Sequence, residues 1–121
     1  MPQCAAAQID VNTNTASLSY PAGQPVTLTT TIRNRSSAPC FYRGYDVAMS
    51  ILDPNLQQLF GTTAHADDVG PQTFAPGQVL TQSATWAPAP TAAPPPGFYS
   101  AQATWSFSGG TYGYTRQFVL R

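Results

Sequence analysis

The chain has 121 residues, and its five arginines and five aspartates give a formal net charge of zero. This length fits a single domain spanning residues 1–121, and the neutral charge gives no electrostatic reason to expect nucleic acid or an anionic membrane as a partner. Lysine and glutamate are absent while Thr, Ser, Pro and Gly are abundant, which argues against a helical protein. No apolar stretch approaches the roughly 20 residues of a membrane span.

Alternating apolar residues predict strands in the first third of the chain. Ile9 and Val11, followed by Leu18 and Tyr20, indicate two short strands separated by an Asn-Thr-Asn-Thr turn. After a second turn, residues 25–34 predict a half-buried strand rich in β-branched side chains. The residues expected on its inward face are Val26, Leu28, Thr30 and Ile32.

The middle of the chain mixes clear strands with a stretch that lacks periodicity. DVAMSILD predicts a strand whose inward residues are Val47, Met49 and Ile51. A turn at residues 53–55 leads to a short strand expected over residues 56–60. Residues 61–73 have no usable period and predict a long irregular loop. FAPGQ is typical of a turn, and VLTQSATW then predicts another strand.

The last third of the chain predicts a stiff loop followed by a hairpin. Residues 87–96 contain five prolines and predict a polyproline-like surface loop. The strand after Gly97 is expected to face inward with Tyr99, Ala101, Ala103, Trp105 and Phe107. SGGT predicts a tight hairpin. In the final strand, Arg116 shares a face with Tyr114 and Phe118, which indicates a bulge or an edge position.

These short strands and their regularly spaced turns predict an all-β fold. Seven to nine strands with turn signals every 8–12 residues are typical of an antiparallel, immunoglobulin-like β-sandwich. We expect Leu28, Met49, Trp86 and Trp105 in its core.

The two cysteines, Cys4 and Cys40, lack the C-x-x-C or Cys/His spacing of a structural zinc site. In an exported chain they would form a disulfide that closes a loop of about 37 residues and stabilises the fold by roughly 3–4 kcal/mol. In a cytosolic chain they would be buried free thiols.

The order of motifs resembles a known group of domains. YPAGQPVTLTTTIRNRSSAP, FAPGQ before a strand ending in Trp86, and PPGFYSAQATW are similar to bacterial immunoglobulin-like domains of the intracellular proteinase inhibitor type, over residues 18–107. Cys4 and the Pro39-Cys40 pair also resemble exported actinobacterial domains of unknown function, in which two such cysteines pair. The resemblances imply a sandwich fold and an extracellular or cell-envelope location. Residues 53–55 and Phe60 depart from the first pattern.

The sequence offers no recognisable catalytic arrangement. It has one histidine, no G-x-S-x-G motif and no obvious carboxylate pair, so we expect neither an enzyme nor a cofactor. His65 lies near Asp67 and Asp68, but a lone histidine beside two aspartates is typical of a solvated loop, and we expect no metal site.

Two aromatic stretches are candidate binding surfaces. CFYRGYD supplies Tyr42, Arg43 and Tyr45, residue types that are frequent at interface hot spots; packing at the end of the core is the alternative. GGTYGYTR supplies Tyr112 and Tyr114, which could stack on a sugar or a partner chain; cross-strand pairing within the sheet is the alternative.

The sequence therefore predicts a non-enzymatic, exported module for protein–protein interaction at the cell envelope, with a partner of unknown identity. One alternative is protease inhibition through loop 61–73, which contains His65, Asp67 and Asp68. Another is binding of carbohydrate, such as a cell-wall glycan, through Tyr112 and Tyr114.

Overall fold

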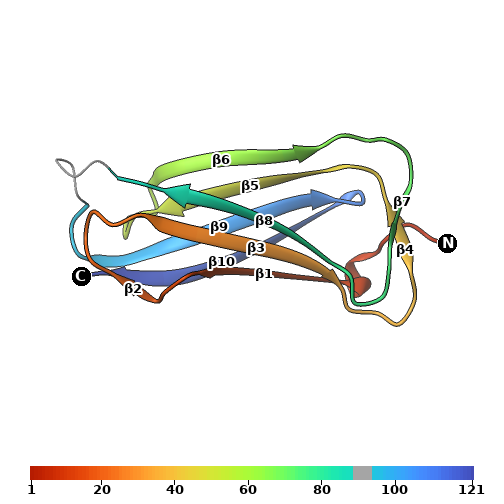
Figure 1. Ribbon diagram of the computed structural model, residues 1–121, viewed down its shortest axis with the longest axis horizontal. Coiled ribbons are helices and arrows are strands. Elements are labelled where there is room, and N and C mark those ends of the chain that lie inside the picture. Colours follow the sequence, from red (N-terminus) through yellow and green to blue (C-terminus); the bar gives the residue numbers. More distant parts are fainter. Residues whose placement is uncertain (89–93) are drawn as a thin grey trace.

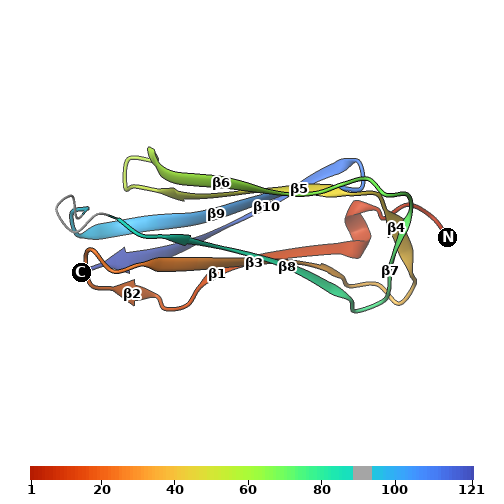
Figure 2. The ribbon, with the colours of Figure 1, turned by 45° about the horizontal axis from the view of Figure 1, so that its top comes forward.

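Two β-sheets lie face to face in the computed structural model, which describes residues 1–88 and 94–121 (Figures 1 and 2). The smaller sheet has the order β1-β3-β8 and consists of β1 (Ile9–Thr15), β3 (Val26–Asn34) and β8 (Val79–Trp86). The larger sheet consists, in spatial order, of β2 (Ser19–Tyr20), β10 (Gly110–Leu120), β9 (Gly97–Phe107), β5 (Tyr45–Leu52) and β6 (Gln58–Ala66). At one end of the molecule lies a two-stranded sheet of β4 (Cys40–Tyr42) and β7 (Gln72–Phe74).

The pairing of these strands confirms the predicted all-β, antiparallel sandwich. Neighbouring strands are antiparallel in every ladder except the parallel pair that joins β2 to the end of β10. The described residues form ten strands rather than seven to nine, because very short strands such as β2 and β7 add to the regular ones. The helical element described is a single 3-10 turn, η1 (Ala6–Gln8), and nothing helical in this part of the chain is long and apolar enough to cross a membrane.

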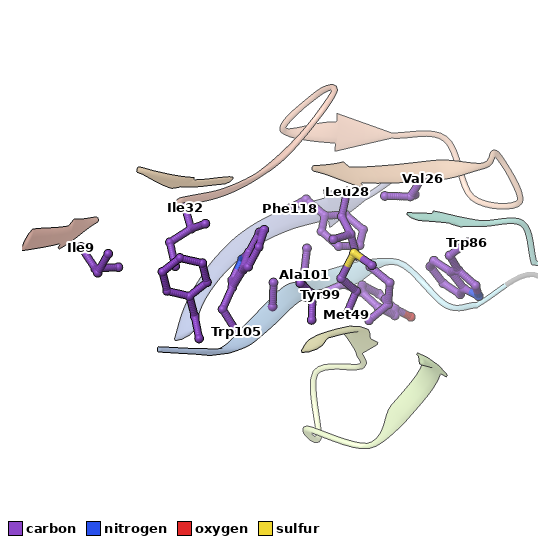
Figure 3. Close-up of a cluster of buried hydrophobic side chains, with 14 of the residues drawn as sticks. Ile9, Val26, Leu28, Ile32, Met49, Trp86, Tyr99, Ala101, Trp105 and Phe118 are labelled. Carbon is purple, nitrogen blue, oxygen red and sulfur yellow. The ribbon is translucent and has the colours of Figure 1, made fainter. Parts of the chain in front are cut away.

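The core lies between the two sheets and is built from alternate residues of their strands. On β9, all five residues predicted to face inward are buried: Tyr99, Ala101, Ala103, Trp105 and Phe107. The four expected core residues are at most 8% exposed, and Figure 3 shows them within one cluster; they are Leu28, Met49, Trp86 and Trp105. The two-residue period of the sequence therefore identifies the inward faces correctly.

A buried hydrogen-bond network connects the two sheets through this core. The indole Nε1–H of Trp105 on β9 donates to Oγ1 of Thr30 on β3, at 2.9 Å. The Thr30 hydroxyl in turn donates to the backbone carbonyl of Asn12 at 3.0 Å, and the Thr13 hydroxyl donates to Thr30 at 3.2 Å. Both threonines are fully buried. The network satisfies polar groups that would otherwise be costly to bury and fixes the orientation of the indole ring.

The turn predicted between Val11 and Leu18 is wrong. β1 continues through the Asn-Thr-Asn-Thr stretch and pairs with β3 from Ile9 opposite Asn34 to Thr15 opposite Leu28. Both asparagines of this stretch are exposed on the outer face of the small sheet, where polar side chains cost nothing to solvate. The expected second strand shrinks to β2, and Leu18 lies outside it with 67% of its surface exposed.

The long irregular loop predicted over residues 61–73 is also wrong. Residues 61–66 belong to β6 and residues 72–73 to β7, so the connection between the two strands comprises only residues 67–71. β6 is an edge strand whose inward residues are at most half-buried. Its inward positions therefore include Thr62 and two alanines beside Phe60, and the alternation is too weak to identify from the sequence.

The predicted β9–β10 hairpin is confirmed, with a small shift in its turn. Ser108 and Gly109 adopt positive φ values of 54° and 76°, while Gly110 already belongs to β10. The bulge suggested at Arg116 is absent from this ladder, because β9 and β10 pair without a register shift; the alternative, an edge position, holds for most of β10. Residues 89–93 of the predicted polyproline-like loop lie outside the described residues.

Candidate functional site at the disulfide end of the sandwich

Cys4 and Cys40 form a disulfide that attaches the N-terminal segment to β4. Both cysteines are buried, at 4% and 0% exposure. Backbone hydrogen bonds hold the same contact, because Cys4 N donates to the Phe41 carbonyl and Phe41 N donates to the Pro2 carbonyl, each at 2.9 Å. A disulfide of this kind is typical of chains that fold in an oxidising environment.

Asn34, at the end of β3, shapes the loop that leads to Cys40. Its side chain is fully buried. The amide Nδ2 donates to the backbone carbonyls of Ala38 at 3.0 Å and Phe74 at 2.9 Å, and Oδ1 accepts from both the backbone N–H and the hydroxyl of Ser36. One side chain therefore connects β3, the loop before β4, and β7.

An aromatic cluster fills the end of the core beneath β4 and β7. Tyr42 stacks on Phe107, with ring centroids 4.9 Å apart, and meets Phe74 edge to face. The ring of Tyr45 lies against those of Trp105 and Phe107, with centroid distances of 5.3 Å and 6.2 Å. Burial, and secondarily the neighbouring Tyr45, raises the pKa of Tyr42. Both tyrosines are half-buried, so packing accounts for most of their contacts.

An open depression of about 420 Å³, here called the end depression, lies beside this cluster. It is lined by three segments that are distant in the sequence: residues 43–46, residues 65–68 except Asp67, and residues 106–111 of the β9–β10 hairpin. Arg43 Nη1 and Asp68 Oδ1 form an ion pair of 3.4 Å within it, and about half of each side chain is exposed. An exposed pair of this kind contributes at most about 1 kcal/mol to stability.

Gly44 allows two of these segments to approach closely. Its φ is +57°, and a Cβ at this position would lie 2.6 Å from the Ala66 carbonyl oxygen and 2.8 Å from the Asp68 backbone nitrogen. These contacts are with backbone, which cannot rotate away. Only glycine fits here, and this packing holds Arg43 beside Asp68.

His65, at the end of β6, lies between two carboxylates. Its Nδ1 is 2.5 Å from Asp46 Oδ1 and its Nε2 is 2.8 Å from Asp67 Oδ1. The hydrogen bond to Asp46, followed by that to Asp67, raises the pKa of His65 above its ordinary value of 6.5. The arrangement suits an imidazolium, whose two N–H groups can both donate.

This geometry does not suit nucleophilic catalysis. The strand register places Asp46 opposite His65 on one side and opposite Ser106 on the other. The aspartate therefore separates the serine from the histidine, whereas a catalytic triad needs the histidine next to the serine. Both ring nitrogens are also occupied by carboxylates. In residues 1–88 and 94–121, no group of three or more His, Cys or Asp side chains is placed to bind a metal ion.

Tyr112 and Tyr114 lie outside the end depression. Both occur on β10 at positions that pair with inward-facing residues of β9, Trp105 and Ala103. Tyr112 is half-buried, whereas Tyr114 is 38% exposed and has the Arg116 guanidinium over its ring at 5.7 Å. The structure therefore does not join them to the other candidate residues.

The structure brings together part of the predicted site. Of the candidate residues, the end depression is lined by Arg43, Tyr45, His65 and Asp68. Tyr42 packs beneath it, and Asp67 contacts it through His65. The sequence did not assign Asp46, Gly44 or residues 106–111 of the hairpin to this site, because their places in it depend on β5 pairing with β6 and β9.

Comparisons with known proteins give a fold likeness but no family. No protein-family model matches the chain, and no curated protein matches it. The structure of Spo0M, the sporulation control protein of Bacillus subtilis, aligns with a TM-score of 0.52 and 14% identity over 94% of this chain and 49% of that chain. This likeness shows the fold alone.

Two other solved structures align less well. The alkylpurine DNA glycosylase AlkC of Pseudomonas fluorescens, bound to DNA with an abasic site analog, aligns with a TM-score of 0.48 and 14% identity over 97% of this chain and 31% of that chain. The ApaA protein of Bordetella pertussis aligns with a TM-score of 0.43 and 18% identity over 93% of this chain and 89% of that chain. The chain thus spans at most half the length of the glycosylase and of Spo0M.

Proposed function

We propose that this domain is a non-catalytic, exported module that binds a partner protein through the end depression. The observation that carries this proposal is the convergence of Arg43, Asp46, His65 and Asp68 from separate segments onto one concave surface. Arginine and tyrosine are both enriched at interface hot spots. The disulfide and the aromatic cluster hold these segments on a rigid frame, which reduces the entropy lost on binding.

The charge of the end depression indicates what kind of surface it fits. Three of the five aspartates gather here, as Asp46, Asp67 and Asp68, together with Arg43. Three negative charges and one positive charge give a local charge of −2, or −1 when His65 is protonated. A partner surface that offers a basic residue to the aspartates and a carboxylate to Arg43 is therefore favoured, because both can replace the weak Arg43–Asp68 pair. Arg43→Glu removes the contact with that carboxylate and puts a like charge in its place.

Affinity capture with matched charge variants tests the proposal. The immobilised domain is incubated with the exported proteins of its native host, as wild type, as Arg43→Glu and as Arg33→Glu. Arg33 is exposed on the outer face of β3, away from the end depression, so its reversal is the control. We expect a protein that wild type and Arg33→Glu retain and Arg43→Glu loses. Retention of the same proteins by all three forms would overturn the proposal.

Export is supported by the disulfide and is tested separately. Protein isolated from the native host without reductant is expected in the extracellular or envelope fraction, with Cys4 and Cys40 joined. Two free thiols in that material would contradict export. An inhibitory loop could comprise only residues 67–71, because residues 61–66 and 72–73 belong to strands. Protease inhibition and carbohydrate binding both stay predictions from the sequence.

A further inference from the structure

β6 forms a bare edge of the larger sheet. It pairs with β5 on one side, and no strand in residues 1–88 or 94–121 pairs with its other side. Figure 1 shows β6 along the upper margin of the molecule. The backbone groups on that side of a nine-residue strand are therefore available to hydrogen-bond with another strand.

β6 carries little of the usual protection for such an edge. Gln58–Ala66 contains no lysine, no arginine, no proline and no acidic residue, and its one ionisable side chain, His65, lies near the end. The register shift in the ladder with β5 leaves one residue of β6 unpaired, Leu59 near the start of the strand, and residues 60–66 pair regularly. Natural edge strands are commonly protected by charges, prolines or bulges, and of these β6 has only the irregularity at Leu59.

We propose that β6 pairs with β6 of a second copy of this chain, antiparallel and symmetric about Thr62. Two-fold symmetry about Thr62 then pairs residues whose numbers add up to 124. Thr62 faces Thr62 of the second copy, and Phe60 faces Ala64 of the second copy, a large side chain opposite a small one. The two larger sheets become one continuous sheet, with an isologous interface.

The charge distribution favours a second copy as the occupant. β6 presents no aspartate or arginine to its own equivalent in this register. The acidic ends of the two copies are kept apart, because His65 lies opposite Leu59 of the second copy. The two His65 positions are thus six residues apart along the paired strands, about 20 Å at roughly 3.4 Å per residue. This separation exceeds the Debye length of about 8–10 Å, so the like-charged ends do not repel strongly.

The second copy would also cover a half-open side of the sandwich. β8, one of the two edge strands of the smaller sheet, lies across from β6. Phe60 and Ala64 on β6, and Leu80 and Ala84 on β8, are only half-buried there and pack at the border of the core. An added strand would remove more of their apolar surface from water.

The size of this contact predicts a weak dimer. A nine-residue strand is about 30 Å long, and two stacked sheets are about 10 Å apart. A strip of these dimensions is smaller than the roughly 800 Å² that each partner buries in a standard, stable interface. We therefore expect reversible association that depends on concentration.

Sedimentation equilibrium with complementary charge variants tests both the strand and the register. Thr62 is exposed, so Thr62→Lys and Thr62→Glu should fold, but each places two like charges directly opposite one another. Thr115→Lys is the control, since Thr115 is exposed on β10, at the other side of the larger sheet. Circular dichroism verifies the fold of each variant.

We expect wild type and Thr115→Lys to rise from 12.9 kDa toward twice that mass with concentration, and each Thr62 variant alone to stay monomeric. Mixing the two Thr62 variants should restore the dimer. A wild type that is monomeric throughout, or a Thr62→Lys variant that still dimerises, would overturn the proposal. A mixture that stays monomeric would overturn the register about Thr62.

Discussion

Replacing Asn34, the last residue of β3, with alanine should destabilise the domain more than replacing any polar side chain of the loop that follows it. The Phe74 carbonyl, which is buried, would lose its hydrogen bond from Nδ2, at a cost of about 1–3 kcal/mol. The loop would also lose its bonds to Ala38 and Ser36, together about 1 kcal/mol because that part is partly exposed. We expect a total loss of about 3 kcal/mol, which is a large share of the roughly 5–15 kcal/mol typical of a domain.

Thermal and urea unfolding followed by tryptophan fluorescence measures this loss. For a chain of this length, about 3 kcal/mol corresponds to a decrease in Tm of roughly 10 °C. Asn14→Ala is the matched control, because Asn14 also lies on a strand of the smaller sheet but is exposed, and we expect its effect to stay within about 0.5 kcal/mol. A loss at Asn34 no larger than that at Asn14 would refute the role assigned to the network.

Three further predictions concern the disulfide end. Reduction of the Cys4–Cys40 bond, which spans 36 positions, should lower the free energy of unfolding by about 4 kcal/mol in urea titrations with and without reductant, and a change below about 1 kcal/mol would contradict this. Gly44→Ala should lower the free energy of unfolding by about 1–3 kcal/mol. Gly77→Ala should lower it clearly less, because Gly77 has a similar positive φ but open space around it. Equal losses of the two variants in thermal unfolding would show that the close approach at Gly44 is unimportant. NMR titration should give His65 a pKa above 6.5, because its two carboxylate partners favour the protonated ring. The stabilisation from these partners is fully present below pH 6.5 and is lost as the pH rises through the pKa of the folded state. A measured pKa at or below 6.5 would exclude this ion-paired arrangement.

The strands that the sequence identifies best are those with a fully buried inward face. β3 alternates cleanly because Val26, Leu28 and Ile32 all pack against the larger sheet, and β9 alternates because it lies in the middle of that sheet. The hydrophobic effect selects every second residue in such strands, so periodicity is enough to place them. Trp86 and Trp105 follow from the same signal.

The sequence signal fails where burial on the inward side is partial. β6 needs only Phe60 and two alanines on its inward face, so nothing in residues 61–66 opposes an irregular loop. That error hides the candidate site, because His65 meets Asp46 only if β5 and β6 pair. A local pattern cannot rank possible strand partners, since register is decided by contacts between segments that are distant in the chain.

The scarcity of charge connects the two proposals while keeping them separable. The chain has only ten formal charges, and three of its aspartates with Arg43 are committed to the end depression. Because the chain contains no lysine, no lysine side chain protects the β6 edge from pairing with another strand. The same scarcity of charge that makes the end depression distinctive therefore leaves this edge exposed. Because Arg43 and Thr62 act on different surfaces, Arg43→Glu should abolish partner capture without changing sedimentation, and Thr62→Lys should do the reverse. If either variant removes both properties, the end depression and the β6 edge must belong to one interface rather than two.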